Sequence, residues 1–321
     1  MIRGRFAPTP SGQMHIGNAR TALLAWLQAR SAGGAFVLRM EDLDRARCRS
    51  DLAHQVLEDL RWLGLDWDEG PDVGGPMGPY VQSERTDAYG AALDRLRAAG
   101  WLYPCFCSRA ELAAIASAPH GLTAEGPSYP GTCRRLTPAQ VAQARAARAK
   151  TPALRFALPD AAVTWDDLVA GPQVFGPGAG GDFVVLRADG IIAYQLAVVV
   201  DDAAMGITDV LRGWDLLDST PRQILLFRAL GLPVPRFAHV SLLFGPDGAR
   251  LAKRHGAVAL AAMRAAGTAP ETLVGHLAYL SGLLDRPEPV RPADLVAKFD
   301  LGRVPRTPVT VTTDTLDRLS R

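Results

Sequence analysis

Arg5-Phe-Ala-Pro-Thr-Pro-Ser-Gly-Gln-Met-His-Ile-Gly-Asn18 is the stretch that decides the fold we expect. Residues 2–8 have the composition of a short strand, and apolar side chains recur at helical spacing from 16 to 30. The prolines and Gly12 between them predict a tight turn. A strand that turns directly into a helix presents unpaired N–H groups and the positive helix end, which favour an anion such as a triphosphate. A turn that only caps a helix explains the same pattern.

The alternation of strand and helix continues outward from this stretch. We expect further elements in the first hundred residues, namely a strand at 35–40 and helices at 51–63 and 86–99. After a region rich in Pro and Gly, the pattern resumes with strands expected at 183–187 and 191–201 and a helix at 221–230. This order predicts an α/β, Rossmann-like, doubly wound parallel sheet split by an inserted module. Residues 256–300 read as helical, and 303–321 read as a loose tail.

The composition is that of an ordinary globular chain. Of 321 residues, 48% are apolar and 21% are charged, which excludes a disordered chain. No apolar run approaches the roughly 18 residues of a membrane-spanning helix, and Met1–Arg5 lacks a signal core, so we expect a cytoplasmic protein without a membrane partner. Among 35 basic residues only Lys150, Lys253 and Lys298 are lysines, which indicates that an ammonium group is needed where one is kept.

Three of the four cysteines lie close together in the sequence. Cys105, Cys107 and Cys133 could bring three thiolates to one ion, and zinc prefers a tetrahedron of four ligands. The fourth ligand stays open on chemistry alone, because His120 is the usual donor type and Tyr129 is unusual. Ordinary reduced cysteines are the other interpretation, and Cys48 is read as incidental.

A basic segment follows the cysteine cluster. Between Gly126 and Pro159 there is no acidic residue, and the local charge comes from Arg134, Arg135, Arg145, Arg148, Lys150 and Arg155. A capped helix is expected from Thr137 to Lys150. Such a stripe suits contact with a phosphate backbone, and a solvated helix face explains it equally well.

Several motifs, in order along the chain, carry a family resemblance. The first stretch resembles the HIGH signature of class I aminoacyl-tRNA synthetases. More narrowly, several segments spread over residues 3–256 resemble the glutamyl branch of this class. They are Arg39-Met-Glu-Asp-Leu-Asp44, Gly64-Leu-Asp-Trp-Asp68, Gln82-Ser-Glu-Arg85, Val199-Val-Asp-Asp202, Gly206-Ile-Thr208, Arg212-Gly213 and Pro221-Arg-Gln-Ile224. Arg250-Leu-Ala-Lys-Arg-His-Gly256 resembles the KMSKS loop in its glutamyl form.

The resemblance implies an ATP site made by both signatures. ATP, with Mg²⁺, would be bound by His15, Gly17, Asn18, Arg250, Lys253 and Arg254. Lys253 is the expected catalytic cation that meets the negative charge developing on the phosphate, together with His15 and with support from His255. Asn18, Arg250 and Ala252 depart from the signatures, and we expect weakened rather than absent catalysis from them.

The resemblance also implies an amino-acid site and a metal set. A substrate with two carboxylates and an ammonium group needs cations and an anion, and arginine recognises a carboxylate bidentately. The glutamate-binding residues carried over from the family are Arg5, Phe6, Ala7, Pro8, Thr9, Glu41, Tyr194 and Arg212. Related proteins bind one Zn²⁺ through a Cys-x-Cys…Tyr-x-x-x-Cys pattern, which favours Cys105, Cys107, Tyr129 and Cys133, with His120 as the second choice.

Only 65 residues follow Gly256, and this outline resembles the glutamyl-queuosine tRNA(Asp) synthetases. That family activates L-glutamate with ATP without tRNA and esterifies it onto queuosine at the wobble position of tRNA(Asp). A minimal glutamyl-tRNA synthetase and a non-catalytic glutamate- or tRNA-binding paralogue remain as alternatives. We expect a monomer divided into catalytic halves at 1–100 and 191–244, an inserted zinc and tRNA-contact module at 101–190, and a KMSKS-like loop with a small helical stem-contact region, without an anticodon-binding domain, at 245–321.

Overall fold

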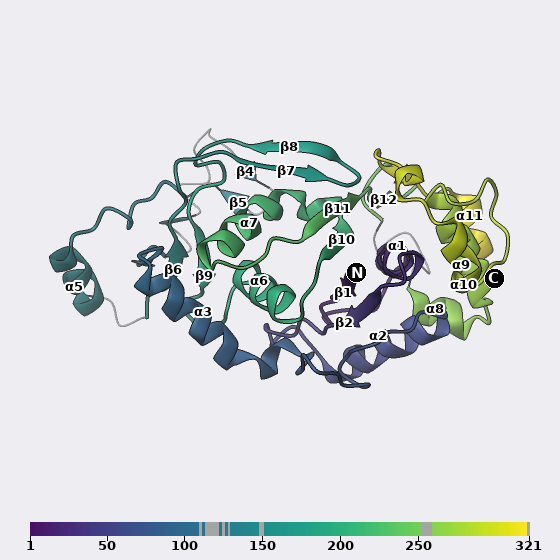
Figure 1. Cartoon of the computed structure of the whole chain (residues 1–321), viewed down its shortest axis with the longest axis horizontal. Coiled ribbons are helices and arrows are strands. Elements are labelled where there is room, and N and C mark those ends of the chain that lie inside the picture. Colours follow the sequence, from purple (N-terminus) through teal and green to yellow (C-terminus); the bar gives the residue numbers. More distant parts are fainter. Residues whose placement is uncertain are drawn as a thin grey trace.

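The computed structural model describes residues 1–108, 111–112, 122–123, 126–127, 129–147, 151–251 and 259–319. A six-stranded sheet runs through the middle of the molecule in the order β2-β1-β10-β11-β7-β8 (Figure 1). In chain order its strands are β1 (Arg3–Phe6), β2 (Ala35–Leu38), β7 (Val163–Asp167), β8 (Gly171–Phe175), β10 (Asp209–Gly213) and β11 (Arg236–Val240). The pairs from β2 to β7 are parallel and β8 is antiparallel to β7, so the sheet is mixed rather than wholly parallel.

Helices cover both faces of this sheet, as expected for a doubly wound fold. Successive strand residues point to opposite faces, so Phe36 and Leu38 enter one hydrophobic cluster and Val37 enters the other. The first cluster includes α1, and the second includes α3, α6 and α7. The helices of this region are α1 (Ile16–Ser31), α2 (Ser50–Trp62), α3 (Thr86–Ala98), α6 (Tyr194–Ala204) and α7 (Thr220–Ala229), with the 3-10 turns η1 (Gln82–Glu84) and η2 (Trp214–Ser219).

The strand expected at 191–201 is wrong, because most of this segment is the helix α6. Every residue of α6 from Gln195 to Asp202 is buried. A helix that is covered on all sides has no polar face, so its apolar run reads like that of a central strand.

The inserted segment forms a second, smaller sheet. Strands β3 (Leu102–Cys105), β6 (Ala153–Phe156) and β9 (Phe183–Leu186) are antiparallel, and β4 (Leu122–Thr123) pairs with β5 (Gly126–Pro127). The strand expected at 183–187 therefore exists, but it belongs to this sheet. Strands β7 and β8 come from the same segment and extend the large sheet instead. The expected basic helix is α5 (Pro138–Ala147), which begins where Thr137 Oγ1 accepts the Gln140 N–H.

The C-terminal region lies at the end of the molecule opposite α5 (Figure 1). It contains α8 (Leu260–Ala265), α9 (Pro270–Leu280), α10 (Pro292–Leu295) and α11 (Thr313–Leu319), the turns η4 (Val296–Lys298) and η5 (Leu301–Arg303), and β12 (Leu243–Phe244) paired with β13 (Val309–Thr310). The loose tail expected at 303–321 is wrong for its described part, since Val311 and Leu319 are fully buried. No described helix is long and apolar enough to cross a membrane.

Candidate functional site

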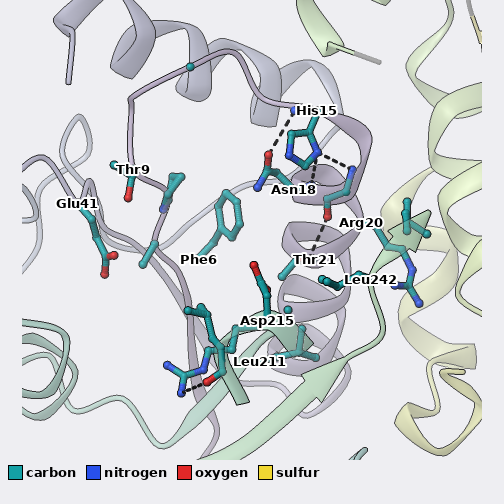
Figure 2. Close-up of a pocket in the computed structure, with 18 of the residues that line it drawn as sticks. Phe6, Thr9, His15, Asn18, Arg20, Thr21, Glu41, Leu211, Asp215 and Leu242 are labelled. Atoms are coloured by element: carbon teal, nitrogen blue, oxygen red, sulfur yellow. Dashed lines mark hydrogen bonds between the residues drawn. The ribbon is translucent and has the colours of Figure 1, made fainter. Parts of the chain in front are cut away.

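A cavity of about 640 Å³ opens where β1 and β10 end and α1 begins. The carboxyl ends of parallel strands are the usual position of ligands in open α/β sheets. In Figure 2, Phe6 divides its wall, with Thr9 and Glu41 on one side and His15 and Asn18 on the other. Of the residues expected from the sequence to bind the nucleotide and glutamate, all those that the structure describes line this cavity. They are Arg5, Phe6, Ala7, Pro8, Thr9, His15, Gly17, Asn18, Glu41, Tyr194, Arg212 and Arg250.

The beginning of α1 is closed by a reciprocal pair of side chains. The Nδ1 atom of His15 accepts the backbone N–H groups of Gly17 at 3.1 Å and of Asn18 at 3.4 Å. Asn18 Oδ1 in turn accepts the N–H of His15 at 3.4 Å. Burial and then the nearby Arg250 cation lower the pKa of His15, and Asp215 partly opposes this. The imidazole is therefore neutral at physiological pH, and Asn18 has a structural role in the cap.

The KMSKS-like motif, which begins at Arg250, lies at the same cavity although it is far from the first motif in the sequence. Arg250 lines the cavity and donates to Asp215 Oδ2 at 2.7 Å. Beyond the motif, the N–H of Leu260 donates to the carbonyl of Met14 at 2.9 Å, directly before His15. The two motifs therefore flank one pocket. Ala252, Lys253, Arg254 and His255 lie outside the described residues.

Arg5 and Glu41 are buried at the other end of the cavity. The Nε atom of Arg5 lies 3.3 Å from Asp202 Oδ1, and Glu41 Oε1 accepts from Arg39 at 3.0 Å. Burial raises the pKa of Glu41, although Arg39 and Arg5 oppose this shift. Burial also raises the pKa of Tyr194, so its hydroxyl stays protonated. This end of the cavity thus offers a cation, a carboxylate and a hydroxyl donor.

Arg212 is a buried cation whose hydrogen-bond acceptors are neutral. It donates to His239 Nε2 at 3.0 Å, to Gln223 Oε1 at 2.7 Å and to Thr220 Oγ1 at 2.8 Å. Burial and the Arg5 cation lower the pKa of Arg212, and Tyr194 and the Asp202 carboxylate oppose this shift. Asp202 forms its ion pairs with Arg5 and Arg39, and no described carboxylate forms one with Arg212. A buried charge without an ionic partner is costly. A carboxylate that enters the cavity beside Arg212 would supply that partner.

Behind the cavity, Glu41 belongs to a network of buried charges whose other members the sequence interpretation did not assign. Arg39 is completely buried and contacts Glu41, Asp202 at 2.7 Å and Asp201 at 3.7 Å. Asp201 also accepts from Arg85 at 2.7 Å. These residues occur within the motifs quoted from the sequence. The signal that could have revealed the network was the presence of Arg and Asp at the ends of apolar strands and helices. The network fixes the loop after β2 against α6.

Sequence reasoning did not assign several polar residues that line the cavity, among them Arg20, Asp215 and Ser241. Arg20 is buried, donates to the carbonyl of Ser241 and to Ser281 Oγ, and so connects α1 with the ends of β11 and α9. Burial lowers its pKa to about 10. An arginine inside the apolar stripe of the first helix was the signal.

The cysteine cluster has the dimensions of a tetrahedral metal site. The Sγ atoms of Cys105, Cys107 and Cys133 all lie within 4.8 Å of one another, with Cys107 and Cys133 at 3.6 Å. The Tyr129 hydroxyl lies 3.5 Å from both Cys105 Sγ and Cys107 Sγ. Ligands around zinc would be separated by about 3.8 Å between sulfurs and about 3.5 Å between sulfur and oxygen. The cluster could therefore bind a metal, and His120 lies outside the described residues.

The basic stripe expected beside this cluster is only partly a free surface. Arg134 donates to Asp182 at 3.1 Å, and Arg155 is buried with its guanidinium 3.8 Å above the Tyr129 ring. Arg135 and Arg145 are exposed. Arg148 and Lys150 lie outside the described residues. Two of the six cations thus stabilise the inserted module itself.

Known proteins resemble this chain over its whole length. The model of the class I tRNA synthetases for E and Q, catalytic domain, matches residues 1–317. A glutamyl-Q tRNA(Asp) synthetase from Symbiobacterium thermophilum is 72% identical over 100% of this chain and 99% of that protein.

Longer relatives match with lower identity. Glutamate–tRNA ligase 2 of Nitrosococcus oceani is 48% identical, over 96% of this chain and 65% of its own length. The crystal structure of a glutamate tRNA ligase from Elizabethkingia meningosepticum in complex with its amino acid superposes with a TM-score of 0.86 at 30% identity. It covers 99% of this chain and 68% of that one. The mixed α/β sheet is thus a class I synthetase fold.

Proposed function

The chain belongs to the class I tRNA synthetases for glutamate and glutamine, and from this premise we propose that it transfers glutamate to the queuosine of tRNA(Asp). The observation that carries the proposal is the 72% identity, over the full chain, to a protein of that name. The geometry is compatible with it, because one cavity combines a helix start for phosphate with buried cations for carboxylates.

In the first step, the α-carboxylate of glutamate attacks the α-phosphorus of ATP. A new P–O bond forms, the bond to pyrophosphate breaks, and glutamyl-adenylate remains. Arg5 and Arg212 would orient the carboxylates, and Glu41 and Tyr194 would hold the ammonium group. His15, Gly17, Asn18 and Arg250 border the space for the phosphates.

In the second step, a hydroxyl group of queuosine attacks the acyl carbon, and AMP leaves. We propose that Lys253 and Arg254, with Mg²⁺ bound to ATP, stabilise the negative charge on the phosphates both when the adenylate forms and when pyrophosphate reverses that step. The expected monomeric state and cytoplasmic location stay predictions.

Pyrophosphate exchange tests the proposal directly. We expect glutamate-dependent ATP–pyrophosphate exchange without tRNA, followed by transfer of labelled glutamate to queuosine-containing tRNA(Asp) and not to the same tRNA without queuosine. Exchange that requires tRNA(Glu) would identify a minimal glutamyl-tRNA synthetase. No exchange under either condition would favour a binding paralogue.

We propose zinc as the metal of the cysteine cluster, held by Cys105, Cys107, Tyr129 and Cys133. Burial raises the pKa of the Cys107 thiol to about 11, and a bound cation would offset that penalty by stabilising the thiolate. Zinc would supply a fold constraint for the inserted module. We expect about one equivalent of zinc in the purified protein by mass spectrometry, and less than about a tenth would contradict the site.

We propose that residues 101–190 and 245–321 contact the tRNA. The exposed Arg135 and Arg145 support this for the inserted module. The double substitution Arg135→Glu/Arg145→Glu should weaken transfer to tRNA and leave pyrophosphate exchange unchanged. Unchanged transfer at low and high salt would identify α5 and the segment before it as a solvated surface.

A further inference from the structure

The neighbours of Arg212 form a chain of hydrogen bonds that crosses three strands. Arg212 on β10 lies beside His239 on β11 in the register of the parallel pair. His239 Nδ1 lies 2.5 Å from Oδ2 of Asp167, the last residue of β7. His239 and Asp167 are fully buried and do not line the cavity, so neither belongs to the set that would touch substrate.

The bonds to Asp167 decide which nitrogen of His239 carries the proton. Asp167 Oδ1 accepts three backbone N–H groups, from Val169, Ala170 and His239 itself, at 3.1, 2.8 and 3.0 Å. Its Oδ2 is thus directed at Nδ1, and a carboxylate there requires Nδ1–H. Burial lowers the pKa of His239, as do the Arg212 and Arg5 cations, and Asp167 opposes them. The neutral ring therefore presents an unprotonated Nε2, which lies 3.0 Å from Arg212 Nε and 3.1 Å from Thr220 Oγ1.

Bare Nε2 is what Arg212 requires. The Nε–H of Arg212 donates to it at 3.0 Å, while the two terminal nitrogens of the guanidinium donate to Gln223, Thr220 and the carbonyl of Leu216. The opposite tautomer, or a protonated ring, would direct an N–H at both Thr220 Oγ1, which can accept it, and the Nε–H of Arg212, which would lose its acceptor. The guanidinium would then have to turn away from its cavity position.

We propose that His239, held in one tautomer by Asp167, is the positioning residue that aims Arg212 at the carboxylate of the amino-acid substrate. The inference rests on the proposed glutamate activation. Because the proposed function assigns Arg212 to the amino acid and not to ATP, loss of this alignment should raise KM for glutamate and leave KM for ATP unchanged.

Two substitutions of His239 separate its two bonds. His239→Asn keeps an amide at the position of Nδ1, facing Asp167, and provides nothing at Nε2. His239→Gln reaches the Nε2 position and can offer its carbonyl oxygen to Arg212. In pyrophosphate exchange we expect His239→Asn to raise KM for glutamate by about 10- to 100-fold, and His239→Gln to restore it to within about fivefold of wild type.

A substitution of Asp167 tests the proton position. Asp167→Asn can place an amide N–H against Nδ1, which favours the wrong tautomer, so KM for glutamate should rise as in His239→Asn. Combined with His239→Gln, which has no tautomer, the same substitution should add no further increase. Thermal unfolding of each variant, with and without ATP, checks that the fold is retained.

The outcomes distinguish the two levels of the proposal. Wild-type protein without glutamate-dependent exchange would remove the proposed function. Wild-type exchange with an unchanged KM in folded His239→Asn, or an equal rise in KM for ATP, would remove only the positioning role. If His239→Asn does not fold, failure of Asp167→Asn to raise KM, or an additive effect in the Gln background, overturns it.

Discussion

Two buried arginines, one behind the cavity and one at its wall, are compensated in opposite ways. Arg39, behind the cavity, contacts three carboxylates, and these raise its pKa despite complete burial. Arg212, at the cavity wall, donates to an imidazole, an amide, a hydroxyl and a backbone carbonyl, and burial lowers its pKa. The difference supports the proposal that Arg212 keeps its charge for a ligand, whereas Arg39 serves the fold.

The largest effect is expected when the charge of Arg212, which faces the proposed ligand, is removed. Arg212→Gln should lower kcat/KM for glutamate by about 10³–10⁴-fold, because a carboxylate would enter a buried site without its cation. Pyrophosphate exchange measures the loss, and Arg212→Lys should give an intermediate value. Arg286→Gln, at an exposed position, is the control that should change nothing. An Arg212→Gln enzyme of normal activity would show that Arg212 is structural too.

Removing the other arginine should act on stability. Arg39→Met leaves Glu41, Asp201 and Asp202 facing one another without their shared cation, and should lower the free energy of unfolding by about 3–5 kcal/mol. Urea unfolding followed by circular dichroism measures it. The matched control is Arg49→Gln, which breaks an exposed pair with Asp51 and should have no measurable effect. A stable Arg39→Met protein with impaired glutamate binding would reverse the two roles.

A third cation sharpens the comparison because its charge is expected to act only in the transition state. Lys253→Ala should lower adenylate formation by about 10²–10³-fold with little effect on the KM for glutamate. Single-turnover formation of adenylate measures the step. Lys298→Ala, at an exposed lysine of the C-terminal region, provides the control. A near-normal rate in Lys253→Ala would remove the role.

The smallest effect concerns a buried carboxylate that does not line the cavity. Burial raises the pKa of Asp59 to about 6; Arg264, 3.6 Å away, opposes this, and Glu58 adds to it. The folded state thus disfavours the charged form, which costs stability above pH 6, and the cost disappears as the pH falls toward 4. Asp59→Asn should therefore raise the free energy of unfolding by about 1–2 kcal/mol at pH 8 and by nothing near pH 4.

Urea unfolding at the two pH values measures the effect. An equal gain at both would show that the amide improves packing rather than removing a charge. The result separates buried charges that are retained near a ligand from those that are merely tolerated.

The sequence predicted the elements whose periodicity is local. Helices α1, α2, α3 and α7 lie within one or two residues of their expected ranges, because apolar residues recur at helical spacing along the chain or a Pro or Gly marks the helix end. Helix α6 was misread as a strand because its buried run contains three consecutive valines, Val198 to Val200, and β-branched residues favour strands. The ordered C-terminal tail was missed because β13 and α11 depend on contacts with β12 and α9, far away in the sequence.

The site could be predicted residue by residue only where a motif named it. The sequence brought Arg5, Glu41, Tyr194 and Arg212 into one hypothesis, and the structure lines one cavity with them. It could not reveal that His239 and Asp167 stand behind Arg212, because no local pattern relates the neighbouring strands β7, β10 and β11. Strand order is decided by the whole fold.

The cap of α1 determines how this protein would address a phosphate. Because Nδ1 of His15 is occupied by two amide hydrogens, the ring proton must reside on Nε2. His15 therefore presents an uncharged Nε2–H donor at the start of the helix, and the hydrogen bond from its backbone N–H to Asn18 Oδ1 holds it there. Its hydrogen bond to an incoming nucleotide would need no protonation of the imidazole, so the bond would not weaken as the pH rises above neutral.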